Sequence, residues 1–243
     1  MLMQLGNDIK NGQNTDLYPS EKICIINELA NGVAHEIKNP LTTTIGLLQL
    51  IKERNLEDKL LNQHIDVALE ETSKINSIIK ELMHISQPSR PDLTFTQIEF
   101  VLDEVSLLID SDAVFNNVTV KRYYQPHLPL AVMDVNQIKR VFINLAVNAI
   151  NAMPGGGLLE INVTYNQEQK KFKIDFKDNG KGISKTEIKK IFYPFYSDGN
   201  EKIGLGLTVS EQLVSKHGGQ IKVTSEKGKG SIFTVHLPVV NTN

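Results

Sequence analysis

The sequence has few of the residues that cross-link a protein or bind zinc. Its 243 residues include no tryptophan and one cysteine, Cys24. A single cysteine excludes an intrachain disulfide framework and a cysteine cluster for zinc, and it suits a reducing compartment. No charge of one sign dominates either, because 26 Lys and Arg stand against 28 Asp and Glu. A formal net charge of -2 gives no electrostatic footprint for nucleic acid, so we expect no nucleic-acid partner.

Long hydrophobic runs are also missing. The longest charge-free stretch, Val141 to Leu159, contains three asparagines, a proline and three glycines, which a bilayer would reject. The N-terminus is polar and lacks the apolar centre of a signal peptide. We therefore expect the chain as given to be soluble and cytoplasmic. A longer protein that contains it could still be anchored in the cell membrane through a part that lies N-terminal to it.

The composition is that of a folded protein with two parts. Hydrophobic residues make up 40% and charged residues 22%, which is near the globular average. The segment Ser86–Asp92 holds two prolines and no large apolar residue, so we place the domain boundary there. The predicted division is an N-terminal linker (1–20), a helical domain (21–87), a second linker (88–94) and a mixed domain (95–240).

The first part has the pattern of a helical hairpin. From Leu61 to Leu82, apolar or small residues recur at alternating spacings of four and three, which is a coiled-coil seam. A similar seam runs upstream, where Pro40 should kink the helix, and Arg54–Asp58 is the predicted turn. Because a lone hairpin buries only one thin seam, we expect a homodimer that forms a four-helix bundle.

The second part mixes strands and helices. Asp134 opens a predicted helix that runs to Met153, with Gln137 as its capping partner. Alternating patterns predict strands at Val118–Tyr124, Leu159–Tyr165, Lys171–Phe176, Gln220–Thr224 and Ser231–Leu237. This mixture favours an α/β sandwich, with one sheet covered by helices on a face.

His35 lies in the first helix within the segment His-Glu-Ile-Lys-Asn-Pro. It is two positions from the seam residues Val33 and Ile37, and so about 200° away on the opposite face. An exposed, neutral imidazole is available as a nucleophile. Glu36 could accept the ring proton, and Asn39 lies one turn further along the same patch. The alternative is a solvated polar face; a zinc-protease motif would need histidine at position 39.

Two asparagines stand out in the helix that begins at Asp134. Asn144 and Asn148 are four residues apart and share a face of an otherwise apolar helix. Their amide oxygens could coordinate a hydrated Mg²⁺ that also contacts phosphates. The alternative is a pair of capping or surface amides, although unsatisfied asparagines are costly on such a helix.

Two glycine-containing segments complete the pattern. Asp178 ends a strand before Asn-Gly-Lys-Gly-Ile, where its carboxylate could accept a hydrogen bond from an exocyclic amine such as adenine N6. The segment Gly204-Leu-Gly-Leu207 opens a helix, whose free N–H groups would face phosphate. Lys202 could also meet phosphate there. Taken alone, Asp-Asn-Gly is most often a turn, and Gly-x-Gly is only weak evidence for a phosphate-binding loop.

The order of these elements resembles the sensor histidine kinases of two-component systems, from about residue 20 to near the end. His35–Pro40 is similar to the H box, Asn144–Asn151 to the N box and Asp178–Ile183 to the G1 box. Phe192–Phe195 is similar to the F box and Gly204–Leu207 to the G2 box. The segment Asn148–Pro154, with the sequence Asn-Ala-Ile-Asn-Ala-Met-Pro, is most similar to the N box of the nitrogen-regulation and sporulation kinases.

The resemblance implies a fold and a reaction. The fold is an antiparallel helical hairpin that forms a dimeric four-helix bundle, followed by an α/β-sandwich ATP-binding domain of the gyrase–Hsp90–kinase–MutL type. His35 would be the phosphoacceptor, Glu36 the base and Asn39 a helper in transfer or phosphatase chemistry. Phosphate would pass to the receiver domain of a response regulator, in a two-component system or a phosphorelay that controls sporulation. The resemblance also admits a small inhibitor protein on the helical domain.

The resemblance also implies the ligand contacts. ATP and Mg²⁺ would be the cofactors, with Asn144 and Asn148 at the metal. The remaining implied nucleotide contacts are Asn151, Asp178, Gly180, Gly182, Ile183, Lys202, Gly204, Leu205, Gly206 and Leu207.

Two departures from the family pattern leave alternatives open. Asn151 stands where many relatives carry a basic residue, and Lys202 replaces a glycine before the G2 box. A dimeric scaffold with degenerate kinase activity that merely senses nucleotide is one alternative. A conformational ATPase of the same fold superfamily is another, but it would not need His35.

Overall fold

The computed structural model describes residues 41–53, 59–86, 91–196 and 204–239. The chain divides into two compact units, Met1–Gln87 and Pro88–Asn243. The H-box residues His35, Glu36 and Asn39 lie outside the described residues, as do Pro40, the predicted turn at Arg54–Asp58 and Lys202.

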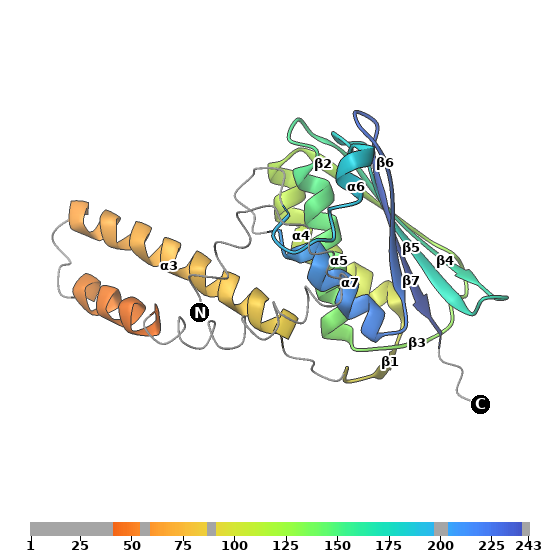
Figure 1. The fold of residues 1–243 in the computed structure, drawn as a ribbon, viewed down its shortest axis with the longest axis horizontal. Coiled ribbons are helices and arrows are strands. Elements are labelled where there is room, and N and C mark those ends of the chain that lie inside the picture. The colour runs from red at the N-terminus through yellow and green to blue at the C-terminus, as the bar shows by residue number, and fades with distance from the viewer. Residues whose placement is uncertain (1–40, 54–58, 87–90, 197–203, 240–243) are drawn as a thin grey trace, which may run out of the picture. The chain divides into compact units, whose positions relative to one another are not determined.

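The described part of the first unit contains two helical segments. Residues 41–53 are helical, and α3 spans Lys59–Ser86 (orange in Figure 1). Lys52 Nζ donates to Asp66 Oδ1 at 2.5 Å and joins the two segments. Of the predicted seam, Ile65 and Thr72 are buried, whereas Ile75 is 43% exposed. Other large apolar side chains of this unit that lie in water are Leu47, Leu50, Ile51, Leu60 and Val67.

The second unit is built on a five-stranded sheet in the order β2-β4-β5-β7-β6. β2 and β4 are parallel and the other neighbours are antiparallel. The strands are β2 (Val118–Tyr124), β4 (Gly157–Asn166), β5 (Lys171–Asp178), β6 (Gln220–Glu226) and β7 (Gly230–Pro238). These are the five predicted strands, each within two residues of its expected bounds. A two-stranded sheet pairs β1 (Thr94–Thr96) with β3 (Ala131–Met133).

The helices α4 (Ile98–Phe115), α5 (Val135–Asn151) and α7 (Gly206–Lys216) lie on one side of the sheet (Figure 1). A short helix, α6 (Lys185–Ile188), follows β5. Asp134 caps α5, because its side chain accepts a hydrogen bond from the backbone N–H of Gln137. The helix ends at Asn151 rather than at Met153, because Ala152 closes it as the C-cap. The predicted α/β sandwich is therefore confirmed.

The core fills the space between these helices and the sheet. Inward residues of β5, among them Phe172, Ile174 and Phe176, are fully buried, while the lysines that alternate with them are exposed. The Phe142 ring of α5 lies 5.5 Å from that of Phe176, measured between centroids. This packing fixes α5 over the centre of the sheet. None of the helices in the described part of the chain combines the length and apolar character needed to cross a bilayer.

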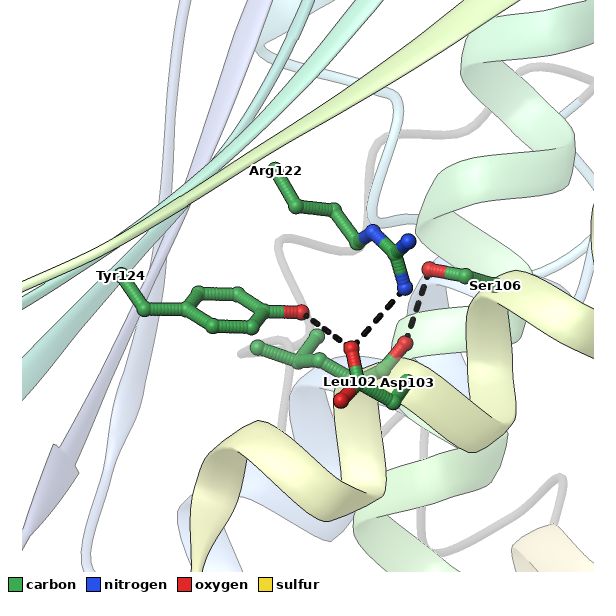
Figure 2. A network of polar contacts seen from close by, with 5 residues as sticks. All are labelled: Leu102, Asp103, Ser106, Arg122 and Tyr124. Carbon is green, nitrogen blue, oxygen red and sulfur yellow. Dashed lines mark hydrogen bonds and ion pairs between the residues drawn. The ribbon is translucent and has the colours of Figure 1, made fainter.

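A polar network fastens α4 to the edge strand β2 (Figure 2). Asp103 Oδ1 accepts hydrogen bonds from Arg122 Nη1 at 2.9 Å and from the Tyr124 hydroxyl at 3.1 Å. One turn further along α4, the buried Ser106 hydroxyl donates to the carbonyl oxygen of Leu102 at 2.9 Å. Burial, and then the neighbouring Asp103 carboxylate, raise the pKa of Tyr124 above its usual range.

Replacing Tyr124 by Phe is expected to lower the free energy of unfolding by about 1 kcal/mol, because one hydrogen bond to Asp103 is lost. The melting temperature should fall by about 2–4 °C at neutral pH. Since the folded-state pKa is raised, the hydroxyl contributes fully below the unfolded pKa of about 10 and less as pH rises beyond it.

Denaturant unfolding of wild type and Tyr124→Phe at several pH values would measure both effects. The difference in stability should narrow above about pH 10. Tyr123→Phe is the matched control, because Tyr123 is adjacent, 51% exposed and without the Asp103 contact. A Tyr124→Phe variant as stable as Tyr123→Phe would show that the network does not stabilise the fold.

Candidate functional site

Asp178 is the centre of the described site. It is the last residue of β5, lies between β4 and β7, and is 4% exposed. Its Oδ1 accepts hydrogen bonds from the backbone N–H groups of Gly180 at 2.8 Å and Ser231 at 3.2 Å. Burial raises the pKa of this carboxyl, and the hydrogen bonds from Gly180 and Ser231 oppose that shift. A buried carboxylate held in one orientation suits recognition of a polar ligand group.

Two serines that the sequence reasoning missed lie beside this carboxyl. The backbone N–H of Ser231 donates to Asp178, and the Ser231 hydroxyl lies 3.0 Å from the Ser225 hydroxyl. Ser225 Oγ in turn donates to the carbonyl oxygen of Gly230 at 2.8 Å. The sequence predicts only a hairpin turn at 228–230, because 53 residues separate Ser231 from Asp178 and only the β5–β7 register brings them together.

The loop after Asp178 is held at both ends. The Ile183 N–H donates to Ser225 Oγ at 2.8 Å, and the Lys181 N–H donates to the carbonyl oxygen of Ala152 at 2.9 Å. Gly182 has a φ of +63°, and a Cβ there would overlap the backbone of Glu226. The loop that contains the predicted contacts Gly180, Gly182 and Ile183 therefore joins the β6–β7 hairpin to the C-terminal end of α5.

Asn144 lies at the other end of the site, on α5. Its Nδ2 donates to Ser210 Oγ of α7 at 2.9 Å. Gly206 begins α7 against this side chain, and a Cβ on Gly206 would overlap Asn144 Oδ1. The predicted metal ligand and the predicted phosphate loop are thus in direct contact. Asn144 lies eight residues, or about 12 Å along the helix axis, before Ala152, whose carbonyl oxygen anchors the loop after Asp178.

The other predicted contacts are distributed around this frame. Asn148 lies one turn after Asn144 and is half-buried, and Asn151 is exposed at the last position of α5. Leu205 is buried, whereas Gly204 and Leu207 are partly exposed. The structure does not test the roles of these residues, which remain predictions.

The aromatic-Pro-Phe segment is tied to the start of α7. Thr208 is buried, and its hydroxyl donates to the carbonyl oxygen of Phe192 at 3.0 Å. A Cβ on Gly204 would overlap the backbone of Tyr196. Tyr196 and Gly204 therefore lie next to each other, close to the beginning of α7.

The amide oxygen of Asn144 fits a divalent cation that is bound together with a phosphate group. Asn144 Oδ1 accepts no hydrogen bond from the described residues, and its side chain is only half-buried. Amide oxygens are ligands that Mg²⁺ accepts, with phosphate and water completing the coordination. Asn144 could therefore hold such a cation at one end of the site, while Asp178 lies at the other.

Comparison with known proteins matches one domain model to each part of the chain. The model of the His Kinase A (phospho-acceptor) domain matches residues 25–91. The model of the histidine kinase-, DNA gyrase B- and HSP90-like ATPases matches residues 133–241.

Several relatives share both units. Sporulation kinase C of Bacillus subtilis is 34% identical over 221 residues, which are 90% of this chain and 50% of that protein. The sensor histidine kinase ZraS of Escherichia coli is 34% identical over 219 residues, which are 90% of this chain and 47% of that protein. The chain thus spans about half the length of these two relatives.

Solved structures show the same architecture. Histidine kinase ThkA, solved in complex with the response regulator TrrA, is 26% identical with a TM-score of 0.65. The match covers 94% of this chain and 68% of the ThkA chain. Full-length ShkA, solved in complex with AMPPNP, has a TM-score of 0.79 at 20% identity. The match covers 88% of this chain and 46% of the ShkA chain. With the phospho-acceptor and ATPase domains both matched in order, the chain belongs to the sensor histidine kinases.

Proposed function

We propose that this chain is the kinase core of a two-component system or phosphorelay, which phosphorylates itself on His35 with ATP and passes the phosphoryl group to a response regulator. The observation that carries the proposal is the buried Asp178, joined through its loop to the α5 helix that also positions Asn144. This arrangement supports a single nucleotide site, in which the carboxylate would accept the adenine amine and the amide would lie at the phosphate end.

The proposed reaction proceeds in two transfers. A ring nitrogen of His35 attacks the γ-phosphorus of ATP; the N–P bond forms, the bond to the β-phosphate oxygen breaks, and ADP leaves. Glu36 accepts the ring proton. A carboxylate oxygen of the regulator then attacks the same phosphorus, which frees the imidazole. Bound Mg²⁺ would neutralise charge on the phosphates, and Asn144 and Asn148 are the residues proposed to hold it.

The other nucleotide contacts are proposed to follow the family pattern. Asp178 would accept the adenine amine, while Gly180, Gly182 and Ile183 let the loop backbone approach the base. Asn151, Lys202 and residues 204–207 would lie toward the phosphates. Asn39 would assist transfer or dephosphorylation on the helical domain.

The partners are proposed on separate grounds. The exposed apolar residues of the hairpin, Ile75 among them, favour a homodimer that covers the seam. Sedimentation equilibrium should therefore give twice the mass of the chain, and a monomer would contradict the dimer.

ThkA was solved with a response regulator, which supports a receiver domain as the second partner. The 34% identity with sporulation kinase C supports a role in sporulation. A small inhibitor protein on the hairpin stays a prediction.

The test is phosphotransfer from labelled ATP. The purified chain should acquire acid-labile label and lose it when a cognate receiver domain is added from a panel. The receiver should gain label in the same interval. A chain that binds nucleotide but never acquires label would favour the nucleotide-sensing scaffold instead.

A further inference from the structure

Ser210 forms a two-step hydrogen-bond chain between α7 and α5. It lies one turn after Gly206 and is 2% exposed. Its hydroxyl donates to the carbonyl oxygen of Gly206 at 2.9 Å, and its oxygen contacts Asn144 Nδ2 at 2.9 Å. Serine often makes the first of these bonds inside a helix, but the second one links it to the proposed metal ligand.

The chemistry of the hydroxyl fixes the direction of this chain. A serine hydroxyl has a single hydrogen, and the Gly206 carbonyl oxygen can only accept, so that hydrogen is committed. Ser210 Oγ must therefore accept from Asn144, which requires the NH₂ group of the amide on this side. The amide oxygen consequently points away from Ser210, into the space that the missing Cβ of Gly206 leaves.

From this arrangement we infer that Ser210 is a positioning residue, which holds the Asn144 amide so that its oxygen faces the cation of a bound nucleotide. The inference rests on the proposed function, because it needs Mg²⁺–ATP at this site. Without the hydroxyl, the amide could turn and present its NH₂ group, which cannot bind a cation. Residues that orient metal ligands in this way typically change metal affinity by about 10- to 100-fold when removed.

The test compares nucleotide binding with and without metal. Titration calorimetry with AMPPNP in Mg²⁺ and in EDTA would be performed on wild type, Ser210→Ala and Asn144→Ala, and on the double variant. Ser106→Ala is the matched control, since Ser106 is 4% exposed on α4 and makes the same type of bond to Leu102, away from the site.

Ser210→Ala should weaken AMPPNP binding in Mg²⁺ by about tenfold and change binding in EDTA by less than about twofold. Ser106→Ala should change neither. In the Asn144→Ala background, adding Ser210→Ala should have no further effect, because the two residues act as a unit.

Two results would overturn the inference. One is a Ser210→Ala variant with the metal-dependent affinity of wild type; the other is an equal loss with and without Mg²⁺, which would indicate a merely structural role. The proposed function fails differently, because wild type itself would then not bind AMPPNP.

Discussion

Asp178→Asn is expected to lower the affinity for ATP by about 10- to 100-fold, while the domain stays folded. The asparagine oxygen can still accept from Gly180 and Ser231, so the loop keeps its anchor. The second carboxylate oxygen, however, becomes an NH₂ group that would face the adenine amine donor to donor. Losing a buried hydrogen bond to a charged group costs about 1.5–3 kcal/mol, which corresponds to that range of affinity.

Calorimetric titration with AMPPNP would measure this loss. Asp175→Asn is the matched control, because Asp175 lies on the same strand but on the outer face, with Lys173 and Thr234 as partners. That variant should bind nucleotide like wild type. Equal affinities for Asp178→Asn and wild type would remove Asp178 from the adenine site.

His35→Gln is expected to reduce self-phosphorylation to background and to leave AMPPNP affinity unchanged. A glutamine carboxamide has no nucleophilic ring nitrogen, and the proposed nucleotide contacts all lie in the other unit of the chain. Labelling with ATP, followed by gel separation at neutral pH, would measure the loss. His64→Gln serves as the control, since His64 is exposed on α3 of the same hairpin and should keep full labelling.

The variants His35→Gln and Asp178→Asn together distinguish a histidine kinase from a conformational ATPase. If the chain releases phosphate continuously and His35→Gln does so at the wild-type rate, hydrolysis does not pass through His35. That result would favour the ATPase alternative. Asp178→Asn should lower activity under either mechanism and is therefore needed to show that the nucleotide site is in use.

Sequence patterns predicted the five strands and α5 because each carries an undisturbed period. α4 was missed, although Ile98, Val101, Leu102, Val105 and Ile109 are buried on one face. Its opposite face is also apolar, with exposed Phe100, Leu107, Leu108, Val114 and Phe115, so the helical period is obscured. β1 and β3 have three residues each, which is too short for an alternating pattern.

The site shows a similar division. Asp178, Asn144 and Gly206 could be selected from local context, because a strand end, a polar residue on an apolar helix and a helix start are local features. Their supporting serines could not, since Ser231 and Ser210 lie 53 and 66 residues from the side chains they contact. For Ser210, the position four residues after Gly206 indicates only the bond to the earlier carbonyl and not the contact with Asn144.

The central claim is that His35 captures the phosphoryl group of ATP bound in the neighbouring domain. The most direct measurement is to incubate the wild-type chain with ATP and Mg²⁺ and to locate the phosphoryl group by mass spectrometry at neutral pH. We predict one acid-labile, alkali-stable phosphoryl group on the peptide that contains His35. A phosphoryl group on any other residue, or its absence from a chain that demonstrably binds ATP, would contradict the account.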